Sequence, residues 1–242
     1  MASTSLSRTI SSGSDINKFT YSFWVKRSGS FGNFQRIISN NITTSKWLYI
    51  RFMNDEAFEA YHTAGGSTIF HLETNQLFKD VSAWYHIVIK FDSTQSNASD
   101  RTILYVNGSQ VTSLATSDYP SQNANAQFIN TNERQDIGYY GANSSEYFDG
   151  YMAHLHFTDG YAYSASTFGS TSTNGQWIPN VTPSVTYGSN GYFLKFTNAS
   201  DLGEDFSGNN NDFTKSGSGD KTSDSPENVF TTLNPNDNYY AN

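Results

Sequence analysis

The sequence predicts an all-β protein in which two antiparallel sheets pack face to face. Apolar and polar residues alternate in many short runs, which is the pattern of strands buried on one side. Clusters of Gly, Asn, Ser, Asp and Thr separate these runs and favour turns. A chain of 242 residues is long enough to form such a sandwich as one unit with a substantial core.

The clearest strand covers residues 19–25, where Phe19, Tyr21, Phe23 and Val25 occupy alternate positions. Side chains at every second position of a strand lie on the same side of the sheet, so these four residues are expected in the core. Further strands are expected at residues 36–39, 47–53, 57–61, 67–72, 84–92, 103–106, 136–141, 148–157 and 191–196.

Two dipeptides predict tight hairpin turns. Gly65-Gly66 and Asn107-Gly108 each follow a strand-like run and precede another. Both residues of each pair accept the positive φ that a two-residue hairpin turn requires. Residues 109–134 are polar with little pattern and predict no strand.

The later part of the chain contains one long strand pattern and one helical turn. In residues 148–157 the odd positions, from Tyr151 to Phe157, are expected to form a single apolar face. A helical turn is expected between Ser164, a suitable N-cap, and Gly169. The four tryptophans are expected in the core: Trp24, Trp47, Trp84 and Trp177.

Charge and composition exclude several classes of protein. The chain has 14 basic and 22 acidic residues and a net charge of −8, which argues against binding to nucleic acid. It has no cysteine, so no disulfide or thiol chemistry is expected. No membrane-spanning segment and no secretory signal peptide are recognisable.

Catalytic and transition-metal patterns are weak. The acidic cluster Asp55, Glu56 and Glu59 lies at a strand end and does not form the paired carboxylates of a glycosidase, so we expect no enzyme activity. His154 and His156 share one face of a predicted strand, but no third ligand lies nearby in the sequence. We expect these two histidines on an exposed or subunit-facing surface.

Four motifs in order resemble the laminin-G-like and concanavalin A-like jelly rolls. They are TYSFWVKRSG (20–29), WYHIVIKFD followed by ILYVNG (84–108), DIGYYG (136–141) and FDGYMAHLHF (148–157). The resemblance implies a two-sheet antiparallel jelly-roll sandwich. It also implies rim sites for Ca²⁺, for which Asp92, Asn107 and Asp149 occupy matching positions. Ordinary turn formation is the alternative for such oxygen-rich loops.

The C-terminal part has a second resemblance. The stretch from Asn190-Gly191 through DSPENVFTTLNP (224–235) is similar to proteins of tailed phages from marine environments. It implies a virion protein on the particle exterior, made in the host cytoplasm, with other capsid or tail proteins as partners and a homo-oligomeric state.

Two functional hypotheses follow. The first is a non-enzymatic structural protein of a tailed phage, either a capsid decoration or a fibre component. The alternative is a lectin-like module that binds host or environmental polysaccharide. Loop aromatics near the closing strands could contact glycan, contact a neighbouring protein, or pack in the core: Tyr139, Tyr140, Asn143, Tyr147, Tyr161 and Tyr163.

Composition divides the chain into a sandwich domain, residues 1–214, and an extended C-terminal arm, residues 215–242. The arm is too polar to fold alone, so it is expected to dock on a neighbouring subunit or to fold back on its own sandwich. Its apolar anchors would be Phe230, Leu233, Tyr239 and Tyr240.

Overall fold

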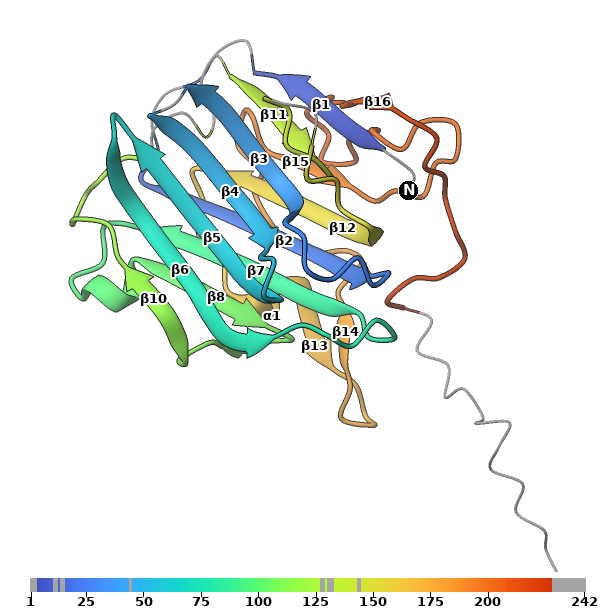
Figure 1. The fold of residues 1–242 in the computed structure, drawn as a ribbon, viewed down its shortest axis with the longest axis horizontal. Helices are drawn as coiled ribbons and strands as arrows, with labels where there is room; N and C mark the ends of the chain where they lie inside the picture. The colour runs from blue at the N-terminus through green and yellow to red at the C-terminus, as the bar shows by residue number, and fades with distance from the viewer. Residues whose placement is uncertain are drawn as a thin grey trace, which may run out of the picture.

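The computed structural model describes residues 4–10, 13, 16–43, 45–126, 129, 133–142 and 145–227. Two large antiparallel sheets face each other, as the sequence predicts (Figure 1). The helical elements of the described residues are one short α-helix, α1 (Ala165–Phe168), and one 3-10 turn, η1 (Ala98–Asp100). No helix among these residues has the length and apolar character needed to cross a membrane.

The first sheet has eight strands. In spatial order they are β10 (Leu114–Asp118), β6 (Ser67–Leu77), β5 (Ala57–Ala64), β4 (Lys46–Phe52), β3 (Gln35–Thr43), β11 (Arg134–Ile137), β1 (Ser5–Thr9) and β16 (Thr214–Ser216). The second sheet has six strands. In spatial order they are β15 (Tyr192–Leu194), β12 (Gly150–Asp159), β2 (Lys18–Arg27), β7 (Tyr85–Asp92), β8 (Thr102–Val106) and β9 (Ser109–Gln110). A separate hairpin joins β13 (Gly169–Thr171) and β14 (Trp177–Pro179).

The core between the two sheets is rich in aromatic rings. Phe19, Tyr21, Phe23 and Val25 of β2 are fully buried on its inner face, which confirms the predicted alternation. The ring of Phe19 stacks on Phe91 of β7 at 4.9 Å between centroids. Large interlocking rings of this kind contribute most of the apolar area that stabilises a sandwich.

Both predicted hairpin turns are confirmed. Gly65 and Gly66 have φ values of 61° and 78° and join β5 to β6, while Asn107 and Gly108 have φ values of 47° and 81° and join β8 to β9. The helical turn is confirmed as α1, which begins after Ser164.

The predicted single apolar face of residues 148–157 is wrong, because β12 contains a β-bulge. The register against β2 shifts between Ala153 and His156, and His154 has a φ of 46°. Beyond the bulge Leu155 is fully buried in the core, whereas before it Tyr151 is 36% exposed. An extra residue reverses the side to which later side chains point.

Two further expectations fail. Residues 114–118 form β10, an edge strand whose polar and largely exposed side chains give no alternating pattern. Of the four tryptophans only Trp24 is buried, while Trp47, Trp84 and Trp177 keep part of their surface exposed.

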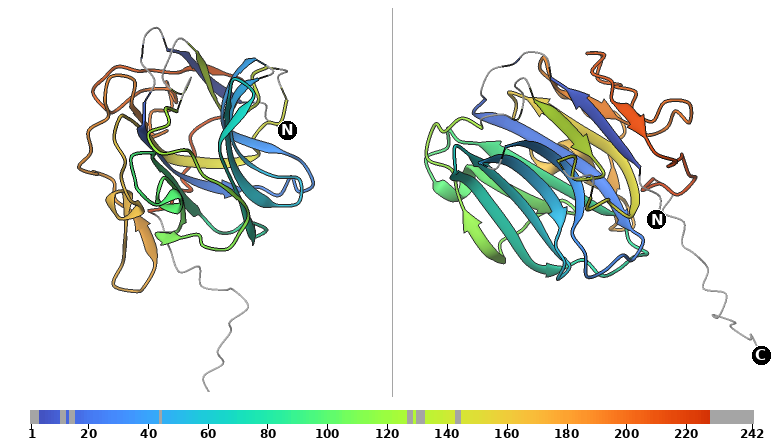
Figure 2. Two further views of the ribbon diagram at one scale, coloured as in Figure 1. Left: turned by 90° about the vertical axis from the view of Figure 1, so that its left-hand side faces the viewer. Right: turned by 45° about the horizontal axis from the view of Figure 1, so that its top comes forward.

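A third layer covers the outer face of the six-stranded sheet. Residues 163–185, including α1 and the β13–β14 hairpin, lie against it, as Figure 2 shows in its left view. Thr20, Ser22 and Trp24 on the outer face of β2 are therefore buried as well. The outer face of the eight-stranded sheet has no such layer among the described residues, and Figure 1 looks onto it.

After β16 the chain crosses from one sheet to the other. We call residues 217–227 the C-terminal strap, because they run along one side of the sandwich from β16 to the outer side of β12 (Figure 1). The predicted arm thus begins within β16, and its described part lies on its own sandwich. The expected anchors lie outside the described residues: Phe230, Leu233, Tyr239 and Tyr240.

Candidate functional site

The tyrosines predicted near the closing strands separate into two groups. Tyr139 is buried and stacks on Tyr147 at 5.5 Å between ring centroids. The hydroxyl of Tyr140 lies 3.2 Å from that of Tyr49 on β4, so this part of the loop approaches the outer face of the eight-stranded sheet. Asn143 lies outside the described residues.

The second group lies against the other sheet. Thr20 on the outer face of β2 donates a hydrogen bond to the carbonyl oxygen of Tyr161 and accepts one from the amide of Tyr163. The two rings stack at 6.4 Å, and Tyr161 is 42% exposed. The five of these residues that the structure describes therefore do not form one site.

A row of aromatic rings crosses the outer face of β4, β5 and β6. Tyr49, Tyr61 and His71 are direct neighbours across these strands, and Trp47 lies two residues before Tyr49 on the same face. Tyr61 stacks on His71 at 4.2 Å, Trp47 stacks on Tyr49 at 5.6 Å, and Tyr140 meets Tyr49 edge to face at 5.7 Å. We call these five residues the aromatic platform. All five are partly exposed.

Arginines and glutamates lie between these rings. The guanidinium of Arg36 lies 3.6 Å from the centre of the Tyr49 ring and donates to Glu146 at 2.6 Å. Arg51 donates to Glu59 at 2.6 Å. The side chain of Arg36 is 3% exposed, so it holds the Tyr49 ring in place, whereas that of Arg51 is 13% exposed and can present donors to a ligand.

The arginines and glutamates between the rings are ionised, and their contacts with one another stabilise these charges. Burial alone would raise the pKa of Glu59, but hydrogen bonds and charge from His71 and Arg51 lower it below its ordinary value. Burial and the nearby Arg51 lower the pKa of Arg36, although an arginine this far from neutral pH stays charged. The aromatic platform is therefore surrounded by ionised arginine and glutamate side chains.

The C-terminal strap is held by two acidic residues of the DSPEN motif. Asp224 accepts hydrogen bonds from Lys26 at 2.8 Å and from the indole of Trp84 at 3.0 Å. Glu227 pairs with the imidazole of His154 at the bulge of β12. Burial alone would raise the pKa of Glu227, but the contact with His154 lowers it to about 2.

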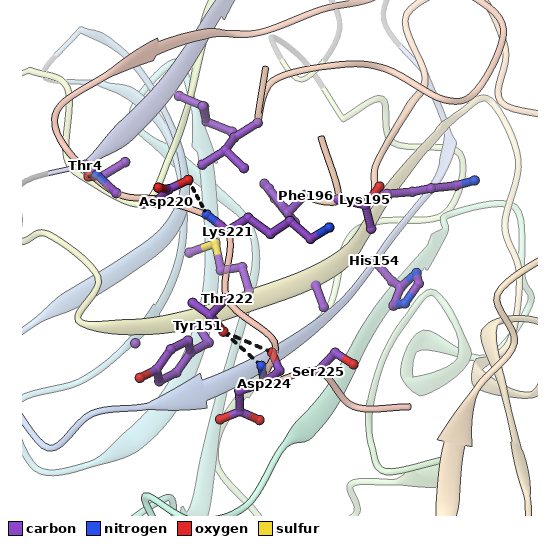
Figure 3. A pocket seen from close by; sticks show the side chains of 18 of the residues that line it. Thr4, Tyr151, His154, Lys195, Phe196, Asp220, Lys221, Thr222, Asp224 and Ser225 are labelled. Carbon is purple, nitrogen blue, oxygen red and sulfur yellow. Dashed lines mark hydrogen bonds between the residues drawn. The ribbon is translucent and has the colours of Figure 1, made fainter. Parts of the chain in front are cut away.

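A groove of about 550 Å³ lies beneath the strap (Figure 3). Its polar rim includes Lys195, Asp220 and Lys221, which Figure 3 shows around the opening. Its apolar lining comes from both sheets and from the chain after β15: Leu6, Ile137, Phe148, Met152, Phe196 and Leu202. Its size lies within the range of small-molecule and peptide sites.

A family model, described as the concanavalin A-like lectin/glucanases superfamily, matches residues 4–167. The chain belongs to this superfamily. All five residues of the aromatic platform lie within this matched range, whereas β15 and the strap come after it in the sequence. No curated protein sequence matches the chain.

Several solved structures are similar at low sequence identity. The heptameric SAP-like pentraxin of Limulus polyphemus is 12% identical with a TM-score of 0.49, over 73% of this chain and 85% of that one. The CBM40 domain of the Ruminococcus gnavus IT-sialidase, bound to α2,6-sialyllactose, is 11% identical with a TM-score of 0.46, over 67% and 94%. Domain 4 of an extracellular arabinanase of Geobacillus stearothermophilus, in complex with arabinotriose, is 14% identical with a TM-score of 0.43, over 62% and 64%.

The residues predicted to bind calcium are not brought together in this superfamily member. Asp92 accepts hydrogen bonds from Thr94 and Gln95, which is turn chemistry. The side chain of Asn107 accepts from the backbone of His86 at the opposite end of the β7–β8 hairpin. Asp149 accepts from Ser30. Bound calcium at these positions stays a prediction.

One other group of side chains could hold a metal. Ligand atoms of Glu59, His71 and Glu73 on β5 and β6 lie within 4.8 Å of one another. His71 already contacts Glu59 at 2.9 Å, and Arg51 occupies the second oxygen of Glu59. A cation would therefore compete with existing ion pairs.

A serine and a histidine lie together in the interior, but they cannot act as a nucleophile and base. Ser22 contacts the Nε2 atom of His86 at 2.9 Å, and the indole N–H of Trp177 donates to Nδ1. An indole can only donate, so Nε2 carries the proton of the neutral ring and cannot take one from Ser22. Burial and, to a lesser extent, His154 lower the pKa of His86 to about 3.

The sequence indicated one member of the platform, Tyr140, and missed the other four. Trp47 is expected in the core from its size, and the predicted strands 57–61 and 67–72 give no sign that Tyr61 and His71 share a surface. The alternation in residues 47–53 puts Trp47 and Tyr49 on one face, and that signal was available. Their alignment with Tyr61 required the register between β4 and β5.

Proposed function

We propose that this protein binds carbohydrate, without cleaving it, on the aromatic platform of the eight-stranded sheet. The observation that carries the proposal is the row Trp47, Tyr49 and Tyr61, partly exposed and set among fixed guanidinium and carboxylate groups. Sugar rings present an apolar face and a rim of hydroxyls. Aromatic rings offer a matching apolar surface at low entropic cost, while Arg and Glu side chains offer hydrogen bonds.

Membership of a superfamily described by lectins and glucanases supports a carbohydrate ligand. It does not choose between binding and hydrolysis, because fold alone does not determine function. The carboxylates of Glu59 and Glu73 are close enough for a retaining glycosidase. However, the side chain of Glu59 is 4% exposed and both its oxygens are occupied by Arg51 and His71, so it cannot reach a sugar.

The test begins with a glycan array to find a ligand, followed by affinity measurements on variants. Tyr61→Ala should weaken binding roughly 10- to 100-fold, which is the range expected when a central aromatic contact is removed. Tyr61→Phe should weaken it far less, because the ring remains.

Tyr161→Ala is the matched control, because it removes an exposed tyrosine on the opposite side of the sandwich. Its affinity should equal that of the wild type. The proposal fails if no glycan binds, or if Tyr161→Ala removes binding while Tyr61→Ala does not. Release of reducing sugars from the bound glycan would contradict the non-catalytic part alone.

A second candidate function is a structural role on the exterior of a tailed-phage particle. The similarity of residues 190–235 to marine phage proteins supports it. The strap gives the DSPEN motif of that stretch a structural role, since Asp224 and Glu227 fix it to the sandwich. Co-purification with intact particles at constant stoichiometry would support this function, and both functions are compatible in one molecule.

A further inference from the structure

In the first half of strand β12, before the bulge, one edge pairs with no other strand of the described residues. Its residues Leu155–Phe157 pair with β15 on one side and, beyond the bulge, with β2 on the other. Among the described residues, Gly150–Ala153 pair with β2 alone, and His154 lies in the bulge. Unpaired backbone N–H and C=O groups on an edge are a template for another strand.

This free edge forms a wall of the groove beneath the strap. All five residues 150–154 line the groove, and Phe196, which has a φ of 57°, directs the chain after β15 away from the edge. Strap residues 219–225 and Glu227 line the same groove, so the edge of β12 and the strap lie on its walls. Main-chain pairing combined with apolar pockets is a common way to bind such a peptide.

The sequence contains a segment that fits this edge. Residues 229–233, VFTTL, are the one run of β-branched and apolar residues in the polar C-terminal stretch 214–242. Five residues are long enough to pair with the four residues Gly150–Ala153 and to reach the bulge at His154. The 15 residues 228–242 carry a single charged side chain, Asp237, so strand addition by this segment requires little desolvation of charge.

The position of Glu227 decides which copy supplies the segment. Glu227 is bonded to His154, at one end of the free edge, and only Asn228 separates it from residue 229. The strap reaches this point after contacting Lys26, the neighbour of Tyr151, so it runs in the direction of β12. Residues 229–233 of the same chain could pair with this edge only after the chain reverses its direction, and a tight turn takes at least two residues.

We propose that residues 229–233 of a second copy of this chain bind as an added strand along residues 150–154, beneath the strap. Exchange of the segment in both directions produces a closed dimer with two-fold symmetry, because each copy has one edge and one segment. This interface lies apart from the aromatic platform and does not depend on carbohydrate binding.

The first test measures the mass of the full-length protein in solution by light scattering. The wild type should have twice the chain mass of 26.9 kDa. Replacing both Thr231 and Thr232 by Pro removes the backbone donors of two adjacent residues, one of which must face β12, and should give a monomer with an unchanged circular dichroism spectrum. Asn238→Pro, outside the five-residue segment, is the matched control and should remain a dimer.

The second test uses the absence of cysteine from the chain. Copies with Met152→Cys are mixed with copies that have one cysteine at a position from 229 to 233 and are then oxidised. A disulfide between the two different copies, identified by peptide mass spectrometry, is expected at one or two of these positions. Ser117→Cys on β10 replaces Met152→Cys as the control and should not link. A monomeric wild type, a dimer that survives the double substitution of Thr231 and Thr232 by Pro, or linking that is equal for Met152→Cys and Ser117→Cys would overturn the proposal.

Discussion

At the scale of single residues, the buried ion pair of Arg27 and Glu56 is the most demanding feature of the fold. The side chain of Arg27 is fully buried, lies 2.6 Å from Glu56, and donates to the carbonyl oxygen of Phe78 at 2.8 Å. Its guanidinium also lies over the ring of Phe52 at 4.6 Å. A buried charge is tolerated only when its partner remains.

Replacement of Arg27 by Met should therefore reduce the free energy of unfolding by about 3–5 kcal/mol, because Glu56 would stay buried without its partner. Urea unfolding at neutral pH measures this change. Lys26→Met is the matched control on the adjacent residue, since its partner Asp224 is substantially exposed. It should cost at most about 1 kcal/mol. Equal losses of unfolding free energy in the two variants would contradict the larger cost expected for breaking a buried ion pair.

Two buried histidines make stability depend on pH. Burial, and to a lesser extent His154, lower the pKa of His86 to about 3, and burial also lowers the pKa of His156 well below its ordinary value. The unfolded chain binds protons near pH 6.5, where the folded protein does not. Stability should be full above pH 6.5 and should fall as the pH drops, by up to about 1.4 kcal/mol per pH unit for each histidine.

The measurement is the free energy of unfolding of the wild type and of His156→Phe between pH 7.5 and 5. The phenylalanine variant keeps the stacking on Phe193, at 3.9 Å in the wild type, but binds no proton. Its pH slope should be smaller by about one proton. An identical slope in both proteins would mean that His156 does not contribute.

At the scale of elements, the β8–β9 turn positions the hairpin layer on the sheet. The ring of Trp177 on β14 packs directly over Gly108, so closely that a Cβ atom there would lie 2.6 Å from it. The same indole donates to His86 on β7. The missing side chain of Gly108 thus allows Trp177 of the outer layer to contact both the turn and the sheet.

Gly108→Ala should destabilise the protein by more than Gly175→Ala. Both glycines have φ near 80°, so both substitutions add similar backbone strain, of about 1 kcal/mol. Only Gly108 also has the contact with Trp177, while the space around Gly175 is open. The difference between their melting temperatures isolates that contact, and equal melting temperatures would contradict it.

The elements also show how far the sequence predicts the fold. Strands with strict alternation, such as β2, were predicted with their core faces, and Asn107-Gly108 was predicted as a turn because its conformation is local. The bulge at His154 could not be predicted, because it depends on pairing with β2. The edge strand β10 was missed because an exposed strand needs no apolar pattern. The platform combines residues from β4, β5, β6 and a distant loop, so it needed the register of the sheet.

At the scale of the whole molecule, the two outer faces of the sandwich differ. The six-stranded sheet is covered by residues 163–185, and the strap reaches its outer side at β12, while the eight-stranded sheet leaves its outer face to solvent in the described part of the chain (Figure 2). The platform lies on the uncovered face, and the groove lies on the side where the strap connects the sheets. The proposed carbohydrate surface and the proposed surface for a second copy therefore lie on different sides of the sandwich.

The most direct test of carbohydrate binding on the platform is a crystal structure with the oligosaccharide that binds best on the array. Binding on the platform predicts sugar density over the rings of Tyr49 and Tyr61, with hydroxyls within hydrogen-bond distance of the Arg51 or Glu146 side chain. Sugar bound instead at Tyr161 and Tyr163, or in the groove beneath the strap, would contradict it.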